Sequence, residues 1–600
     1  MSPSILSNGN AHIAENGISA SKRYSVHDQV WDRQYGIWTK APAPPKALTD
    51  GQEVFVAYRR KSANTNNADP FTHIELQDQR LVMFLRNVLP TETSLFNKPA
   101  SIDAQLLYVS RKRIQEASSQ PDVSADLHKA VETLLDFVGE EFADVEEKLQ
   151  ALPAGTIAWS LLWLLFEVGQ QVEIVYDLTG EKMAMQVEGW AYAMSQKGRT
   201  FNLHGHVFQW TGVRIQKIKV TRKVLEFSKL NPISTLPVRP LTDDMRAKLI
   251  ERSKIYLEHC AQVYCGYKGS FVMKAHSGGV RVNGEGRAMI DVRQFRRSVP
   301  VMDVWDDDVN TNDAEIIDLG DDVDWNVETT AHLLPPTLHG FSFVHKKWGE
   351  FSVDKLRSVT WADAPFRHLV LSDSYREVVR SLIEVHSSDK KDLLLTDVVQ
   401  GKSSGCIIAL YGNPGCGKTL TAEAVSEHLR RPLYSVSAGE LGTSVTALEQ
   451  NLKNVLDLAT YWNAVLLIDE ADVFLEKRDS RELERNGLVS IFLRVLEYFS
   501  GILILTTNRL ESFDNAFLSR FSLILRYPDL DAPSRRVLWD RFLVMADSDS
   551  FAFDLDALAT IELNGRAIKQ TVRTAQALAL TRGVPLSSDH IDTVLSMNVG

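Results

Sequence analysis

Eight consecutive residues carry the clearest chemistry in this chain. A short apolar run at residues 407–411 leads into a glycine-rich turn, and an amphipathic segment begins behind it at Leu420. Glycines at this spacing let backbone N–H groups approach a phosphate chain at the positive end of a helix dipole. The spacing therefore predicts a phosphate-binding loop (P-loop) for a nucleotide. Its residues are Gly412, Asn413, Pro414, Gly415, Cys416, Gly417, Lys418 and Thr419.

Lys418 and Thr419 supply the side chains that such a loop requires. The Lys418 ammonium is placed to bind the outer phosphates, and the Thr419 hydroxyl is placed to ligate the magnesium ion that accompanies them. The alternative is a glycine turn that only connects a strand to a helix. Because lysine and threonine both occupy their motif positions, we expect nucleotide and Mg²⁺ as ligands.

Two acids, Asp469 and Glu470, follow a second apolar run at residues 464–468. Open α/β sheets place ligands at the carboxyl ends of their strands, so these acids are expected near the P-loop. Asp469 is then placed to hold magnesium, and Glu470 is placed to polarise the attacking water as a general base. The alternative is that both acids only cap the next helix, whose first turn favours acids.

Further polar groups follow the later apolar runs. Asn508 directly follows the apolar run at residues 501–507. Its amide is placed there to orient water against a γ-phosphate. Arg520 follows a short helical segment, and Arg566 stands at the start of an amphipathic helix.

These residues must be positioned by short apolar strands that alternate with helical patterns. Continuous apolar strands separated by helices predict a parallel sheet covered on both faces. The expected fold is an α/β P-loop core with a five-stranded parallel sheet and a C-terminal helical lid, preceded by an α+β N-terminal region. The expected strands lie at residues 407–411, 432–436, 464–468, 501–507 and 523–527.

Taken together, these motifs resemble the AAA family of ATPases, over roughly residues 360–600. Additional segments look like fungal AAA-type ATPases that carry an N-terminal domain of unknown function. The core motifs lie at residues 412–419, 466–472, 506–509 and 516–521, and the additional segments at 340–350, 484–486, 494–499 and 564–569.

The resemblance implies a role for each polar residue. Asp469 would hold magnesium, Glu470 would activate water and Asn508 would be the first sensor of the nucleotide. Arg520 would be an arginine finger that enters a neighbouring subunit's site, and Arg566 would be the second sensor.

The resemblance also implies ligands and partners. ATP and Mg²⁺ are the expected cofactors, Asp397, Val398 and Gly401 would lie beside adenine, and the partners would be further copies of the chain and a protein client. Fold analogy suggests six subunits.

Two features depart from the family pattern. Residues 438–444 form a shorter segment than in polypeptide-threading members, and they lack the aromatic pore residue. The finger region offers Arg520 where many relatives offer two arginines. Threading by an aromatic paddle is therefore not expected.

The length of 600 residues allows several domains. Helical spacing at residues 127–152 and strand patterns at 172–176, 183–192 and 207–220 favour an α+β domain before the core. We expect a mostly disordered segment at 1–50, an α+β domain that binds a client or partner at 51–300, an acidic linker at 301–345, the nucleotide-binding core at 346–530 and the lid at 531–600.

The net charge of −11 argues against a nucleic-acid partner. A local basic patch is better explained as a solvated strand face than as a strand-binding surface. His204 and His206 are expected to be ordinary turn histidines, because no third metal ligand stands at a recognisable spacing. The basic patch consists of Lys217, Lys219, Arg222 and Lys223.

Targeting signals are weak throughout. No stretch approaches the roughly 18 apolar residues that span a bilayer. The first twenty residues resemble neither a signal peptide nor a transit peptide. The four cysteines show no metal-type spacing. A cytoplasmic or nuclear protein in a reducing compartment is the resulting expectation.

Three functions are compatible with these observations. The first is Mg²⁺-dependent ATP hydrolysis coupled to remodelling of a protein or complex. The second is a nucleotide-gated scaffold in which hydrolysis is slow or incidental, as the absent pore aromatic suggests. A DNA-directed motor is the third, and the acidic composition disfavours it.

Overall fold

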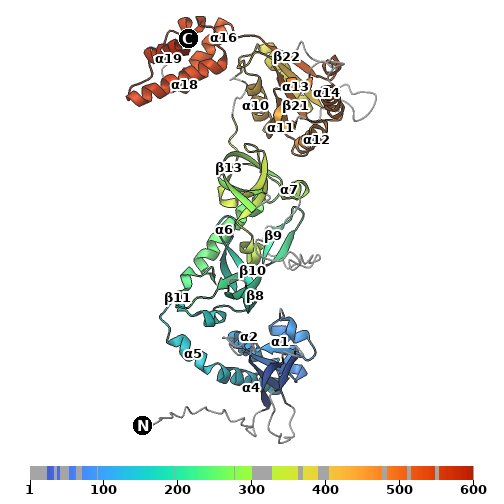
Figure 1. Cartoon of the computed structure of the whole chain (residues 1–600), viewed down its shortest axis with the longest axis vertical. Coiled ribbons are helices and arrows are strands. Elements are labelled where there is room, and N and C mark those ends of the chain that lie inside the picture. The colour runs from blue at the N-terminus through green and yellow to red at the C-terminus, as the bar shows by residue number, and fades with distance from the viewer. Residues whose placement is uncertain are drawn as a thin grey trace, which may run out of the picture.

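The computed structural model arranges the chain as successive modules along its long axis, from the N-terminus to the C-terminal helices (Figure 1). The structure describes residues 23–32, 37–40, 53–61, 71–90, 92–195, 198–275, 278–299, 327–362, 366, 369–388, 405–442, 444–475, 483–509, 515–546 and 553–598.

The first module is a five-stranded sheet covered by helices. Its strand order is β2-β1-β3-β4-β5, and β1 pairs with β3 in parallel. The strands are β1 (Tyr24–Asp32), β2 (Ile37–Lys40), β3 (Phe55–Lys61), β4 (Phe71–Leu76) and β5 (Ser101–Asp103). The helices are α1 (Gln79–Val88), η1 (Thr93–Phe96), α2 (Ala104–Val109), α3 (Arg111–Ser118), α4 (Ala125–Glu141) and α5 (Ala143–Gln150).

The second module is an antiparallel sheet with the order β10-β9-β8-β7-β12. It shares one continuous apolar core with the first module. The strands are β6 (Thr156–Ile157), β7 (Gln171–Val175), β8 (Lys182–Ser195), β9 (Gly198–Trp210), β10 (Ile215–Leu225), β11 (Asn231–Pro232) and β12 (Val238–Pro240). The helices are η2 (Trp159–Leu165), η3 (Ile233–Thr235) and α6 (Asp243–His259).

The third module, which we call the barrel, occupies residues 263–357. Its strand order is β14-β15-β16-β13-β17, and an additional pairing between β13 and β14 closes four of these strands into a ring. The strands are β13 (Val263–Ala275), β14 (Gly278–Ile290), β15 (Thr337–Ser342), β16 (Lys347–Ser352) and β17 (Leu356–Arg357). The helices are α7 (Val292–Ser298), α8 (Val327–Thr330), η4 (Ala331–Leu333) and η5 (Val353–Lys355).

The fourth module confirms the expected P-loop fold, since all five expected apolar runs are strands of one parallel sheet. Its order is β19-β20-β21-β18-β22. The strands are β18 (Cys406–Gly412), β19 (Leu433–Ser437), β20 (Val465–Asp469), β21 (Ile502–Thr507) and β22 (Leu523–Tyr527). The helices are α9 (Asp373–His386), α10 (Lys418–Leu429), α11 (Ala438–Leu441), α12 (Val445–Tyr461), α13 (Asp472–Leu475), α14 (Leu483–Leu496) and α15 (Asn515–Leu518).

Both faces of this sheet are covered, because its strands are apolar on both sides. One apolar cluster joins the strands to α12 and α14, and another joins them to α9 and α10. The C-terminal helices form a lid with its own core around Trp539, which is fully buried. The lid consists of α16 (Ala532–Met545), α17 (Leu555–Thr560), α18 (Gly565–Arg582) and α19 (Ser588–Asn598).

The structure differs from the expected domains in two places. The disordered segment expected at residues 1–50 contains β1 and β2, and the Tyr24 ring stacks on Phe55 at 4.8 Å between centroids. The acidic linker expected at 301–345 contains β15, which pairs with β14 and β16 inside the barrel. Residues 301–326 lie outside the described part of the chain.

The N-terminal region also differs in detail from its sequence patterns. The single domain expected at 51–300 is divided among three sheets, and the barrel crosses its boundary. The expected helix at 127–152 is two helices that meet at Phe142, and the expected strand at 207–220 is a hairpin of β9 and β10. In both segments the apolar pattern continues across the point where one element ends and the next begins. Periodicity alone does not reveal that boundary.

Candidate nucleotide site

The P-loop joins β18 to α10 by a turn that only glycine permits. Gly412, Gly415 and Gly417 all have positive φ, at 152°, 80° and 104°. A Cβ atom on Gly412 would lie 2.3 Å from the Tyr527 carbonyl oxygen of β22. The loop therefore depends on close backbone approach at the start of a helix, where backbone N–H groups favour an anion.

Lys418 is buried beneath this loop. Its Nζ donates to the carbonyl oxygens of Gly412, at 2.6 Å, and of Asn413, at 2.9 Å, and to Asn508 Oδ1, at 2.9 Å. The expected P-loop lysine and the expected sensor amide therefore lie in direct contact.

The two expected magnesium ligands also meet. Thr419 Oγ1 lies 3.3 Å from Asp469 Oδ2 and 3.4 Å from Oδ1, although the two residues are fifty positions apart. A hydroxyl and a carboxylate are the hard oxygen ligands that Mg²⁺ prefers, so this pair fits the ion.

Glu470 stands at the edge of this site. It is exposed, and its backbone has a positive φ of 56°. Its N–H donates to Thr506 Oγ1 at 3.0 Å, and the Thr506 hydroxyl in turn donates to Asp469. The buried Thr506 hydroxyl on β21 therefore orients both Asp469, the expected magnesium ligand, and the backbone turn at Glu470, the expected general base.

Asp472 orders the neighbouring strand end. Its Oδ1 accepts from the Thr507 hydroxyl and from the Asn508 N–H, at 3.1 Å for the latter. Asp472 thus binds the backbone of Asn508, the expected sensor, while Lys418 binds the Asn508 side chain.

Thr506 and Asp472 were absent from the sequence-based site. A signal existed for each, since Thr506 is a polar residue near the carboxyl end of an apolar strand and Asp472 is the third acid of its motif. Neither signal distinguishes a residue that contacts ligand from one that orients its neighbours.

The lid reaches the P-loop through the start of α18. A Cβ atom on Gly415 would lie 2.9 Å from the Asn564 side chain and 3.2 Å from the Arg566 Cβ. Asn564 caps α18 by accepting from the Ala567 N–H at 2.8 Å. The structure therefore brings Arg566 beside the phosphate-binding loop.

The remaining loop residues serve the loop itself. Asn413 Nδ2 donates to Asp529 at 2.6 Å, and Cys416 Sγ lies 2.9 Å from the Asn413 carbonyl oxygen. Burial raises the pKa of the Cys416 thiol above its ordinary value. Pro414 lies in the turn, and Leu420 on the first turn of α10 is 41% exposed.

Arg520 is not turned toward this chain's own P-loop residues. Its Nη1 donates to the Ala516 carbonyl oxygen in α15 at 2.7 Å. Asp397, Val398 and Gly401, the expected adenine neighbours, lie outside the described residues.

The basic patch and the two histidines of the second module contact neighbouring side chains. Lys217 pairs with Glu188 at 2.6 Å and Arg222 pairs with Asp177, so the basic patch on edge strand β10 is partly neutralised. His204 bonds to Thr221 at 2.8 Å and His206 to Glu188 at 2.8 Å. Within the described ranges, no group of three or more His, Cys, Asp or Glu is gathered as a metal site.

The P-loop, the acid pair at the end of β20 and the amide at the end of β21 define a P-loop nucleoside triphosphatase fold. Residues 408–529 match the model of the ATPase family associated with various cellular activities (AAA). Residues 147–244 match a domain of unknown function, DUF7025. The AAA match therefore lies C-terminal to the DUF7025 match.

Three curated proteins are similar to part of this chain. Nuclear valosin-containing protein-like from Mus musculus is 31% identical over 29% of this chain and 22% of its own length. An uncharacterized AAA domain-containing protein from Schizosaccharomyces pombe is 30% identical over 29% of this chain and 24% of its own. Proteasome-activating nucleotidase 2 from Halobacterium salinarum is 27% identical over 38% of this chain and 56% of its own. The chain thus spans about half or less of the length of these relatives.

No helix in the part of the chain that the structure describes combines the length and the apolar character needed to cross a membrane.

Proposed function

We propose that this protein hydrolyses ATP with Mg²⁺ and uses the nucleotide cycle to remodel a protein or complex. The contact between Lys418 Nζ and Asn508 Oδ1 carries the proposal, because it joins the phosphate-binding loop to the sensor strand. Thr419 and Asp469 would hold magnesium, which supplies charge neutralisation at the phosphates when bound. Glu470 would take the proton of the attacking water.

The arginines and the oligomer belong to the same proposal. Arg566 would report nucleotide state from the lid, and Arg520 would serve a neighbouring copy's site after leaving the Ala516 carbonyl. Asp397, Val398 and Gly401 would contact adenine. A homo-oligomer, six-membered by fold analogy, and a client held by the modules before the barrel complete the proposal. The four cysteines of the chain are free thiols, and we propose a location in the reducing cytoplasm or nucleus.

Removing the metal tests the chemistry directly. We expect phosphate release from ATP to fall to the rate in buffer without protein when EDTA replaces Mg²⁺. The ion supplies the positive charge that neutralises the phosphates, and Thr419 and Asp469 only hold it. The measurement is steady-state phosphate release by the full chain with added Mg²⁺, with EDTA, and with Mg²⁺ restored in excess. Equal rates with and without the metal would contradict the assignment of Thr419 and Asp469.

The buried hydroxyl of Thr506 gives a second prediction. Thr506→Val keeps the side-chain shape but removes the group that bonds to Asp469 and to the Glu470 N–H. We expect kcat to fall about tenfold, since small displacements of positioned groups are costly in catalysis. Ser490→Ala, an exposed hydroxyl on α14, is the control. A kcat equal to that of the control would show that Thr506 does not orient these acids.

A nucleotide-gated scaffold is the second candidate. One observation favours it: the segment after β19 is a short capped helix, α11, whose Glu440 pairs with Lys346 of the barrel at 2.5 Å. A segment tied in this way is poorly suited to threading a polypeptide. Light scattering with ATP, with ADP and without nucleotide separates the two candidates. ATP-dependent assembly with negligible turnover would favour the scaffold.

A further inference from the structure

The barrel contacts the AAA domain, and neither family model covers its residues. The DUF7025 match ends at residue 244 and the AAA match begins at residue 408, whereas the barrel lies within residues 263–357. Barrel residues Met289 and Phe341 belong to the same buried cluster as strands β19, β20 and β21. Since β19 is an edge strand of the AAA sheet, the barrel covers that edge.

An aromatic group forms the centre of this contact. The Phe341 ring of β15 lies 5.5 Å from Tyr434 of β19 and 5.3 Å from Trp462, measured between centroids. The Trp462 indole N–H donates to Asp291 Oδ2 of the barrel at 3.0 Å. Asp291 is 2% exposed and Trp462 is 3% exposed, so this bond is enclosed. The two modules therefore pack as one unit at this edge.

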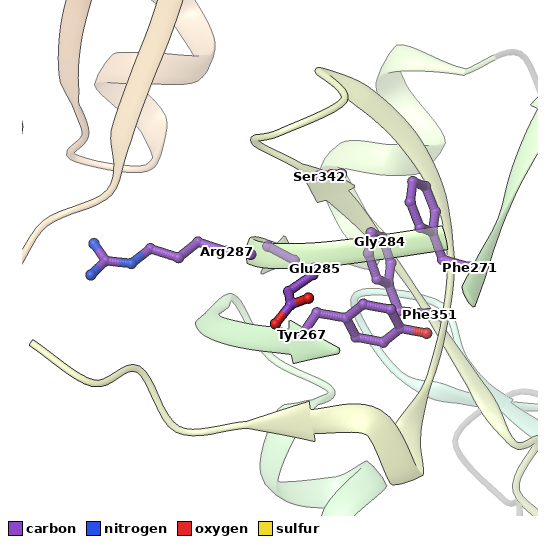
Figure 2. A pocket seen from close by; sticks show the side chains of 9 residues that line it. Tyr267, Phe271, Gly284, Glu285, Arg287, Ser342 and Phe351 are labelled. Atoms are coloured by element: carbon purple, nitrogen blue, oxygen red, sulfur yellow. The ribbon is translucent and has the colours of Figure 1, made fainter. Parts of the chain in front are cut away.

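Arg287 makes the contact that reaches the P-loop helix. Figure 2 shows its side chain leaving β14 on the side away from the Phe271 ring of the barrel interior. Its guanidinium forms an ion pair with Glu427 near the end of α10, and it lies over the Trp361 ring at 4.8 Å. Glu427 Oε2 also accepts from the Ala362 N–H at 2.8 Å.

Glu427 lies on the same helix as Lys418 and Thr419 of the P-loop. α10 begins with Lys418 and Thr419 and ends at Leu429. At about 1.5 Å per residue, Glu427 lies roughly 14 Å along the helix from Lys418. A pivot at the Glu427 end would therefore shift the phosphate-binding end, whose alignment with Asp469 depends on a contact of 3.3 Å.

We propose that Arg287 is a positioning residue for ATP hydrolysis, which clamps α10 from the barrel through Glu427. The proposal rests on the proposed function, since it assigns Arg287 to the same reaction. The clamp also gives the barrel a role: displacement of the modules before it would be transmitted to the P-loop helix through this ion pair.

The test uses charge reversal in the full-length chain. Arg287→Glu places two carboxylates together, and Arg287→Glu combined with Glu427→Arg restores an ion pair of the opposite sense. Lys268→Glu is the matched control, because Lys268 faces Glu285 on the same hairpin at 3.0 Å with both side chains about 70% exposed. The measurements are kcat and KM for ATP and the melting temperature of each variant.

We expect kcat of Arg287→Glu to fall about tenfold, within the range found for residues that couple distant sites. The double variant should recover kcat to within about threefold of wild type, since the ion pair returns but the stacking on Trp361 does not. Lys268→Glu should match wild type. Recovery of activity by the swap is a readout that simple loss of fold would not produce.

Three results would overturn the proposal. If Arg287→Glu matches Lys268→Glu in kcat, α10 does not need the clamp. If the swap fails to recover activity while its melting temperature equals that of wild type, the ion pair is not what positions the helix. If wild type itself shows no Mg²⁺-dependent turnover, the proposed function fails and this inference fails with it. Turnover in wild type thus separates failure of the clamp from failure of the ATPase.

Discussion

Glu470→Gln is expected to lower kcat for ATP by about a hundredfold to ten-thousandfold, the usual contribution of a general base. Glutamine has the same shape but cannot accept the water proton. The backbone of Glu470, held by Thr506 Oγ1 at 3.0 Å, should stay in place, so the P-loop should keep its form. Nucleotide affinity is therefore expected to remain within about threefold of wild type. Phosphate release and the binding of a fluorescent ATP analogue measure the two quantities.

The control for this variant is Asp457→Asn, which makes the same chemical change at an exposed position of α12. It should leave both quantities unchanged. A Glu470→Gln protein that turns over ATP at the wild-type rate would remove the general-base assignment. A variant that binds ATP without turnover also provides a trap for the client, because a complex held in the ATP state can be crosslinked and identified by mass spectrometry.

Glu350→Ala is expected to destabilise the region before the AAA domain by about 3 kcal/mol, as removal of one partner from a buried polar group usually does. Glu350 is 2% exposed. Its Oε2 accepts from the Tyr176 hydroxyl at 2.6 Å and from the Thr337 hydroxyl at 3.1 Å, and its Oε1 lies 3.4 Å from His339 Nε2. The substitution would remove the buried acceptor of both hydroxyls.

The carboxylate also joins two modules. Tyr176 follows β7 in the second module, whereas Glu350, Thr337 and His339 belong to barrel strands. Chemical denaturation at pH 7, followed by intrinsic tryptophan fluorescence, measures the change. Glu285→Ala on the exposed side of the same barrel is the control and should change stability by less than about 0.5 kcal/mol. Equal midpoints for the two variants would show that Glu350 is not a central contact.

The Glu350 carboxyl gives this stability a pH dependence. Burial by itself raises its pKa, but the electrostatic attraction of His339 and the hydrogen bonds from Tyr176 and Thr337 outweigh burial, and the pKa lies below its ordinary value. A carboxyl with a lowered folded-state pKa contributes stability above its unfolded-state pKa. That stability is lost as the pH falls through the folded-state pKa. Wild type should therefore lose more stability on acidification than Glu350→Gln.

The AAA core could be predicted almost completely from local sequence. Each of its strands is a short apolar run, because a parallel strand covered on both faces is apolar at every position. The P-loop and the Asp469 pair were recognisable because phosphate and metal binding demand particular residues at fixed spacing. The fold prediction for this module is confirmed, and the P-loop, Asp469, Glu470 and Asn508 lie together at the carboxyl ends of its strands.

The N-terminal modules were predicted less well, for a physical reason. β1 pairs in parallel with β3 and not only with its hairpin neighbour β2, and this long-range pairing leaves no local pattern. Likewise β15 follows an acidic run yet pairs inside the barrel with β14, which precedes that run in the sequence. Pairings of this kind are decided by which surfaces meet, and sequence periodicity reports only that a surface exists.

The sequence alone therefore predicted the chemistry that we propose for this protein: phosphate binding by Gly412 to Thr419, metal binding by Asp469 and proton transfer by Glu470. These roles depend on residue type and short-range spacing, which the chain carries from the start. Only the tertiary structure decided that Lys418 touches Asn508, that Thr506 holds both acids and that Arg287 reaches Glu427. Such contacts join residues 36 to 140 positions apart, and packing alone brings them together.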